Sequence, residues 1–115
     1  MVSGDNMEIV VLVTAKDEIE ADKIAEHLVR QKLAACANVL SGINSFFRWR
    51  DKLDKAEEVL LIVKTRKSLF KKLERAVRSL HSYDLPEIIA LPIIMGSKDY
   101  LDWVRQSTSS AKGKP

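Results

Sequence analysis

The spacing of apolar residues changes within the first 30 positions, and the change predicts a strand followed by a helix. Residues 8–14 form an apolar run of strand character. The apolar residues of the next stretch fall at the i, i+3, i+4, i+7 spacing of one helix face, namely Ala21, Ile24, Ala25 and Leu28. Asp17, with Glu20 three residues later, suits the start of this helix, since its carboxylate can accept backbone N–H groups.

The middle of the chain predicts a long β-hairpin. Residues 35–50 have strand character, with Gly42 as a bulge. Asp51 tolerates the left-handed backbone of a tight turn better than most residues do. We therefore expect the chain to reverse there into a second strand at 57–65.

A second helix and a last strand follow the hairpin. Residues 67–81 return to the helical period, with apolar residues on one face and mostly basic residues on the other. Pro86 cannot continue that helix, and residues 87–94 then have strand character. Pro92 lacks a backbone N–H, which favours an edge position for this strand. Ser97 can cap a short final helix.

The predicted order, β-α-β-β-α-β with an added C-terminal helix, is that of a ferredoxin-like sandwich of the α+β class. A chain of 115 residues, of which 46% are apolar, is large enough for one domain with a single core. We expect residues 8–108 to form this domain, residues 1–7 to be a flexible lead, and residues 109–115 to be a disordered tail.

The predicted sheet has apolar residues on both faces. An antiparallel sheet with both helices on one side normally alternates apolar and polar residues, because its other face meets water. Here the strand at 9–13 is apolar at every position, and the strands at 59–63 and 88–91 repeat the pattern. Burial contributes about 25 cal/mol per Å² of apolar area, so leaving one face of the sheet exposed to solvent would be strongly unfavourable. We therefore expect a homo-oligomer that packs through this face, the alternative being a monomer whose final helix covers it.

Composition and charge argue against several classes of partner. No apolar run approaches the roughly 20 residues of a membrane-spanning helix, and the first ten residues lack the features of a secretory signal. Cys36 is the only cysteine, which rules out an internal disulfide and fits a reducing compartment. The net charge of +3 is modest, and the strands at 9–13 and 59–63 lack the aromatic rings on which RNA-binding sheets stack bases. We expect a cytoplasmic protein with no membrane or nucleic-acid partner.

Residues 81–87, with the sequence HSYDLPE, gather an imidazole, a phenol and two carboxylates in one connector. In one interpretation this connector only ends a helix, with His81 at the carbonyl end of the helix dipole. In the other it is a binding site, where His81 and Glu87 take a cation and the Tyr83 hydroxyl donates to a ligand. Composition alone favours the helix end.

Cys36 also allows two interpretations. It lies among small apolar residues at the start of a strand, a setting typical of buried packing. As a thiolate it could instead join an imidazole and a carboxylate to hold copper or zinc. The chain has neither a G-x-S-x-G motif nor a glycine-rich phosphate loop, so we expect a binding protein and not an enzyme.

Five segments occur along the chain in a characteristic order: VLVTAKDEIEADKIAEHLVRQKLAACANV, FFRWRDKL, EEVLLIVKTR, LHSYDLPEIIALPI and DYLDWV. Together they resemble the CutA family of divalent-cation tolerance proteins, and the match runs from about Glu8 to Thr108. The resemblance implies a homotrimer of ferredoxin-like subunits, similar to the PII signalling proteins, with clefts between subunits. It also implies a role in tolerance of copper and other divalent cations.

Matched position by position, the resemblance implies a site made of Cys36, Trp49, Lys64, His81, Tyr83 and Glu87. His81, Glu87 and Cys36 are the expected ligands of copper or another divalent cation. Lys64 and Tyr83, with Trp49, are expected to hold a polar or anionic small ligand. The alternative function is a PII-like sensor or scaffold whose cleft binds a small anion or a partner segment.

The chain departs from the family pattern at four positions. Ser82 stands where the HPY motif has Pro, and Asp51 where the hairpin usually has Gly. Val13 and Leu80 occupy positions where members with a stronger case for copper carry Cys and His. Only His81 remains of that set, so tight copper binding is not implied.

Overall fold

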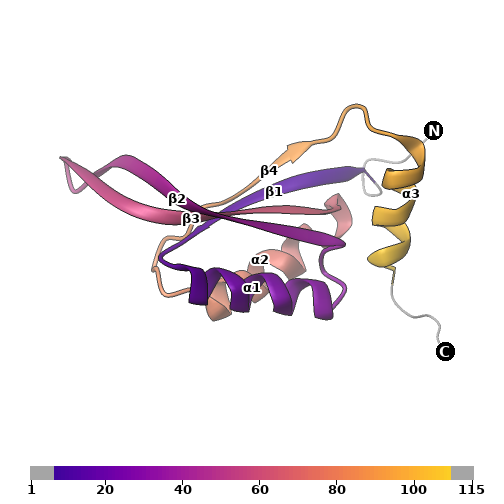
Figure 1. Cartoon of the computed structure of the whole chain (residues 1–115), viewed down its shortest axis with the longest axis horizontal. Helices are drawn as coiled ribbons and strands as arrows, with labels where there is room; N and C mark the ends of the chain where they lie inside the picture. Colours follow the sequence, from indigo (N-terminus) through magenta and orange to yellow (C-terminus); the bar gives the residue numbers. More distant parts are fainter. Residues whose placement is uncertain (1–6, 110–115) are drawn as a thin grey trace.

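The computed structural model describes residues 7–109 as a four-stranded antiparallel sheet with two helices on one face and a third helix at one end (Figure 1). The lead predicted for residues 1–7 and the tail predicted for 109–115 lie outside the described residues, apart from Met7 and Ser109. The bounds of the single domain therefore stay a prediction.

The elements follow the predicted order. They are β1 (Glu8–Ala15), α1 (Glu18–Arg30), β2 (Cys36–Trp49), β3 (Lys52–Arg66), α2 (Phe70–Leu80), β4 (Ile88–Pro92) and α3 (Lys98–Ser107). The strand order in the sheet is β2-β3-β1-β4, so the last strand lies at an edge beside the first. This confirms the ferredoxin-like α+β fold and the edge position that Pro92 predicted.

Local sequence signals set the helix ends. The Asp17 side chain accepts a hydrogen bond from the Glu20 N–H over 2.9 Å, and the Glu20 carboxylate reaches back to the Lys16 N–H over 3.0 Å. Ser97 caps α3 in the same way, by accepting from the Tyr100 N–H over 3.3 Å. These contacts satisfy donors that a helix start otherwise leaves without partners.

The hairpin of β2 and β3 is longer than the sequence predicted, because β3 begins at Lys52 and not near residue 57. Only Arg50 and Asp51 make the turn, both with positive φ, of 52° and 65°. That pair of angles is typical of the two-residue type I′ turn, which matches the twist of the flanking strands. Gly42, with φ of 79°, lies where the register shifts between Leu40 and Ile43, which confirms the predicted bulge.

The hydrophobic core lies between the sheet and the helices α1 and α2. It includes completely buried side chains of β1, α1, β3 and α2, among them Val11, Val13, Ile24, Leu28, Leu61, Val63, Leu73 and Val77. Each such side chain contributes about 1.5–3 kcal/mol by leaving water, so this layer holds the two helices on one face of the sheet.

The opposite face of the sheet, called the helix-free face below, keeps exposed apolar side chains. Ile89 and Leu91 on β4 are 49% and 50% exposed, and Leu40 on β2 is 53% exposed. α3 lies at one end of the sheet (Figure 1). Arg105 of α3 forms an ion pair with Glu8 of β1 over 2.6 Å. The final helix therefore leaves much of this face uncovered, as the sequence predicted.

Candidate functional site

A cleft of about 700 Å³ opens where the β2–β3 hairpin leaves the body of the sheet. The hairpin supplies one wall and the connector between α2 and β4 supplies another. Its lining residues are Thr14, Ser45, Phe46, Phe47, Arg48, Trp49, Asp54, Glu58, Tyr83, Asp84, Leu85 and Glu87. The strand register puts Phe47 opposite Asp54, which lies on the same face of β3 as Glu58, so much of this cleft belongs to the helix-free face.

Tyr83 and Glu58 form the polar floor of the cleft. The Tyr83 hydroxyl donates a hydrogen bond to Glu58 Oε2 over 2.9 Å, and Glu58 is only 8% exposed. Burial raises the pKa of Tyr83 to about 12, and the hydrogen bond to the neighbouring carboxylate acts in the same direction. Tyr83 is therefore a neutral donor at physiological pH.

His81 lies behind the cleft with a fully buried side chain. Its Nε2 is 2.6 Å from the carbonyl oxygen of Thr14, and its Nδ1 is 3.1 Å from the Tyr83 backbone N–H. A carbonyl only accepts and an N–H only donates, so these partners assign a neutral imidazole with the proton on Nε2. Both ring nitrogens are used within the chain, and a metal would have to displace one of these contacts.

The connector is also held by Glu20 of α1. Its Oε2 accepts from the Ser82 N–H over 2.7 Å, and its Oε1 lies 4.0 Å from His81 Nδ1. Burial acts to raise the pKa of Glu20, but the hydrogen bonds from Lys16 and Ser82 outweigh it and lower the pKa below its usual value. Glu20, whose other oxygen accepts from the Lys16 N–H at the start of α1, thus also fixes the start of the HSYDLPE segment.

The structure divides the residues that the sequence singled out. Trp49, Tyr83 and Glu87 line the cleft, with His81 behind it. Cys36 and Lys64 are directly opposite each other on β2 and β3, toward the other end of the sheet. Glu58 and Lys64 are six residues apart on β3, which is about 20 Å at the rise of a strand.

Cys36 and Lys64 belong to a second polar cluster. Lys64 Nζ donates to Asn38 Oδ1, and the Cys36 thiol lies 3.9 Å from the same oxygen. Burial raises the pKa of Tyr100 on α3, and the neighbouring Cys36 adds to the shift. Cys36 is half-buried, in a more polar setting than its apolar sequence neighbours suggested.

One chain does not assemble the metal site that the sequence suggested. Among residues 7–109 no group of three or more His, Cys, Asp or Glu side chains is arranged to hold a metal ion. Two reasons are visible: the His81 nitrogens are engaged, and Cys36 lies far along the sheet from Glu87. The ligand set of His81, Glu87 and Cys36 therefore stays a prediction, and it requires residues of more than one subunit.

Glu58 was not among the residues that the sequence singled out. Its signal was present, because Glu58 comes directly before the apolar run of β3, and the two-residue period of a strand puts it on the same face as Leu60 and Ile62. Asp84 was counted among the carboxylates of the HSYDLPE connector but was given no role. Only the folded chain brings Glu58 and Asp84 together, in the cleft beside the hairpin.

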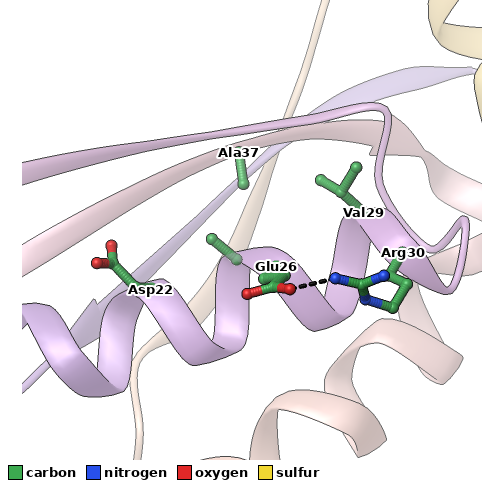
Figure 2. Close-up of a pocket in the computed structure, with 6 residues that line it drawn as sticks. Asp22, Glu26, Val29, Arg30 and Ala37 are labelled. Atoms are coloured by element: carbon green, nitrogen blue, oxygen red, sulfur yellow. Dashed lines mark hydrogen bonds and ion pairs between the residues drawn. The ribbon is translucent and has the colours of Figure 1, made fainter.

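Another cleft, of about 630 Å³, lies between α1 and the edge strand β2 (Figure 2). Its floor is Ala25, Val29 and Ala37, and Glu26 on its rim is paired with Arg30. None of the candidate site residues predicted from the sequence lines this cleft. The cleft beside the hairpin is therefore the better candidate for the functional site.

Comparison with known proteins agrees with this fold. The family model for "CutA1 divalent ion tolerance protein" matches residues 9–107. The chain belongs to the CutA1 family. This confirms the resemblance seen in the sequence.

Individual CutA relatives match over most of the chain. A "Divalent-cation tolerance protein CutA" of Thermus thermophilus is 47% identical over 102 residues, which cover 89% of this chain and 99% of the relative. "Protein CutA" of Homo sapiens is 44% identical over 98 residues, or 85% of this chain. The chain spans 55% of the human relative's length and 55% of that of the chloroplastic CutA of Arabidopsis thaliana.

Solved CutA structures resemble this one closely. The protein "Cut A1" of Thermus thermophilus superposes with a TM-score of 0.88 at 47% identity, over 90% of this chain and 100% of the other. A "Periplasmic divalent cation tolerance protein CutA" from Archaeoglobus fulgidus gives a TM-score of 0.87 at 41% identity, over 90% and 100% of the two chains. The names of these relatives refer to different compartments, so the cytoplasmic location stays a prediction. No helix among the described residues is long and apolar enough to cross a membrane.

Proposed function

We propose that this CutA1 protein is a non-enzymatic, cytoplasmic homotrimer that acts in the response to divalent metal ions, copper among them. In this proposal it binds a cation or a small ligand at clefts between subunits. The relatives' names support the link to divalent cations. The number of three subunits and the position of the clefts between them come from the family resemblance.

The observation that carries the proposal is the position of the candidate residues. Cys36, Lys64 and Glu58 all lie on the helix-free face, where Ile89, Leu91 and Leu40 stay exposed. Packing this face against a neighbour would remove its apolar side chains from water. It would also bring polar residues of two subunits together.

The separation within one chain is consistent with a shared site. Cys36 and Lys64 of one copy would complete the cleft of another copy, where Trp49, Tyr83 and Glu87 lie. In such a site Glu87 supplies a carboxylate and Cys36 a thiolate to a divalent cation. His81 holds the connector in place, and it becomes a ligand only if it releases Thr14 or Tyr83.

The assembly is tested by sedimentation at micromolar concentration. We expect one species near three times the 13.0 kDa subunit mass. A folded species of 13.0 kDa at all concentrations would contradict the trimer and the shared site with it.

The metal site is tested by calorimetric titration of copper and of zinc. Cys36→Ser and Glu87→Gln remove one donor each, and Glu57→Gln is a matched control because it changes an exposed carboxylate next to Glu58 on the other face of β3. We expect heats that weaken in the first two variants and not in the control. Identical weak heats in wild type, Cys36→Ser, Glu87→Gln and His81→Ala would contradict metal binding here.

The PII-like alternative is supported by the second polar cluster. Lys64 there offers an ammonium group that is bound to Asn38, and Tyr100 lies beside the neighbouring Cys36. This set suits a small anion better than a metal. A thermal shift with phosphate that is absent in Lys64→Ala would favour this function.

A further inference from the structure

The cleft beside the hairpin has an excess of negative charge. Four carboxylates line it, from Asp54, Glu58, Asp84 and Glu87, against the single guanidinium of Arg48. Among residues 7–109, none of these carboxylates has a side-chain nitrogen of Lys, Arg or His within 4.0 Å, and the one Lys nitrogen near them is the backbone N–H of Lys55, which donates to Asp54.

Glu58 makes this excess significant. It is more than nine-tenths buried, and the one donor that the described residues give it is the neutral Tyr83 hydroxyl. A buried carboxylate normally has a cationic partner, because removing it from water is unfavourable. Within one chain, the nearly buried Glu58 carboxylate therefore has a hydroxyl partner but no cationic one among the described residues.

Aromatic rings form the other part of the lining. Phe46, Phe47, Trp49 and Tyr83 come from the hairpin and the connector, and Trp49 is nearly half exposed. The faces of such rings attract cations. Two of them already do so at the outer end of the hairpin: the Arg50 guanidinium lies 5.8 Å from the Trp49 ring, and Lys55 Nζ lies 5.3 Å from the Phe46 ring.

We propose that this cleft binds an organic ammonium ion, a protonated or quaternary amine, between its aromatic rings and its carboxylates. The inference rests on the proposed function in taking this cleft as the binding site, and it requires that Lys64 of a neighbouring copy leaves the carboxylates of the cleft free. A bare metal ion needs several donor atoms converging within about 2.0–2.6 Å, and within one chain no such group is present among the described residues. A diffuse, weakly hydrated organic cation is held instead by charges and ring faces spread over a cleft of about 700 Å³.

Tetramethylammonium is the probe, and the fluorescence of Trp49 is the readout. The chain has two tryptophans, and Trp103→Phe leaves Trp49 as the only one. Tetramethylammonium chloride is titrated into this variant as the full chain in its native assembly, with sodium chloride at the same ionic strength as reference. We expect a saturable change with tetramethylammonium only, and an equal change with sodium chloride would overturn the proposal.

Substitutions assign the binding to the cleft. Glu58→Gln keeps the side-chain shape and an acceptor for Tyr83 but removes the charge, and we expect at least tenfold weaker binding. Glu57→Gln, on the opposite face of β3, should change the affinity by less than twofold. Phe47→Leu should weaken binding several-fold by removing a ring while keeping an apolar side chain. Unchanged affinity in folded Glu58→Gln protein would overturn the proposal.

Two further measurements separate this inference from the proposed function. Copper or zinc binding by a trimer that ignores tetramethylammonium would overturn the inference and leave the metal role standing. Tetramethylammonium binding by a trimer that binds neither copper nor zinc would overturn the metal role and leave the inference standing. Tetramethylammonium binding seen only in Lys64→Ala protein would mean that the lysine of a neighbouring copy fills the cleft, and this result would also overturn the inference.

Discussion

The ring of His81 is tied to the carbonyl oxygen of Thr14 across 67 positions of sequence, with 2.6 Å between Nε2 and that oxygen. The same ring accepts the Tyr83 N–H and lies 4.8 Å from the Tyr83 ring, measured between centroids. His81 therefore connects the end of β1 to the connector that lines the cleft, and its first role is to position Tyr83.

His81→Ala should destabilise the fold by about 2–4 kcal/mol, because it removes the partner of the part-buried Thr14 carbonyl and Tyr83 N–H and leaves a cavity where the buried ring was. Urea unfolding at a fixed protein concentration measures the change. His27→Ala on α1 is the matched control, since the described structure gives that ring no hydrogen bond or ion pair comparable to those of His81. Equal stability of the two variants would contradict the positioning role.

Glu20 should make the stability depend on pH in the acid range. Its folded pKa lies below the usual value of 4.5, so its contribution is complete above that value and is lost as the pH falls through the lower, folded pKa. In Glu20→Gln the free energy of unfolding should fall less steeply below pH 4.5 than in wild type. Glu26→Gln, on the exposed side of α1, serves as the control and should keep the wild-type slope.

Tyr83 should ionise well above an ordinary tyrosine. With a folded pKa of about 12, it favours the folded state at neutral pH, and this contribution falls as the pH rises from 10 through 12. Ultraviolet absorbance at alkaline pH measures tyrosinate formation. The part of the absorbance change that belongs to Tyr83, centred near pH 12, should be missing in Tyr83→Phe. In Glu58→Gln it should move to lower pH, because the neighbouring negative charge is removed.

Arg105 should hold α3 to the sheet. It pairs with the nearly buried Glu8 of β1 and with Asp102 of its own helix. Since Arg105 is itself about one-third exposed, solvent screens the pair, and Arg105→Ala should cost about 1–2 kcal/mol. Amide hydrogen exchange should accelerate in Lys98–Ser107 and not in the core strands. Lys98→Ala removes an exposed ion pair of the same helix and should have little effect.

The helix-free face offers a test of assembly by charge. Ile89→Glu alters a half-exposed residue of β4, and a lone subunit would tolerate it. In the proposed trimer the same change buries a charge, so the 13.0 kDa subunit should appear in sedimentation. Ile19→Glu changes a more exposed isoleucine on α1 and should leave the assembly intact. Intact assembly in Ile89→Glu would contradict packing through β4.

Short-range signals determined much of the fold. The Asp17 and Ser97 caps, the Gly42 bulge and the edge position of Pro92 all follow from neighbouring residues, and each is present in the structure. The period of two in the strands determined which side chains share a face. That period is enough to predict the apolar second face of the sheet, because side-chain alternation is a local property of a strand.

Only the tertiary structure decided which candidate residues meet. Lys64 pairs with Cys36, and Thr14 approaches His81, through strand register and helix packing that join distant parts of the chain. These contacts separate Cys36 from the cleft and occupy both nitrogens of His81. The fold also places Glu58 in a cleft that is lined by aromatic rings and other carboxylates. The sequence supplied the chemical groups, but their distances depend on long-range pairing, which no local pattern encodes.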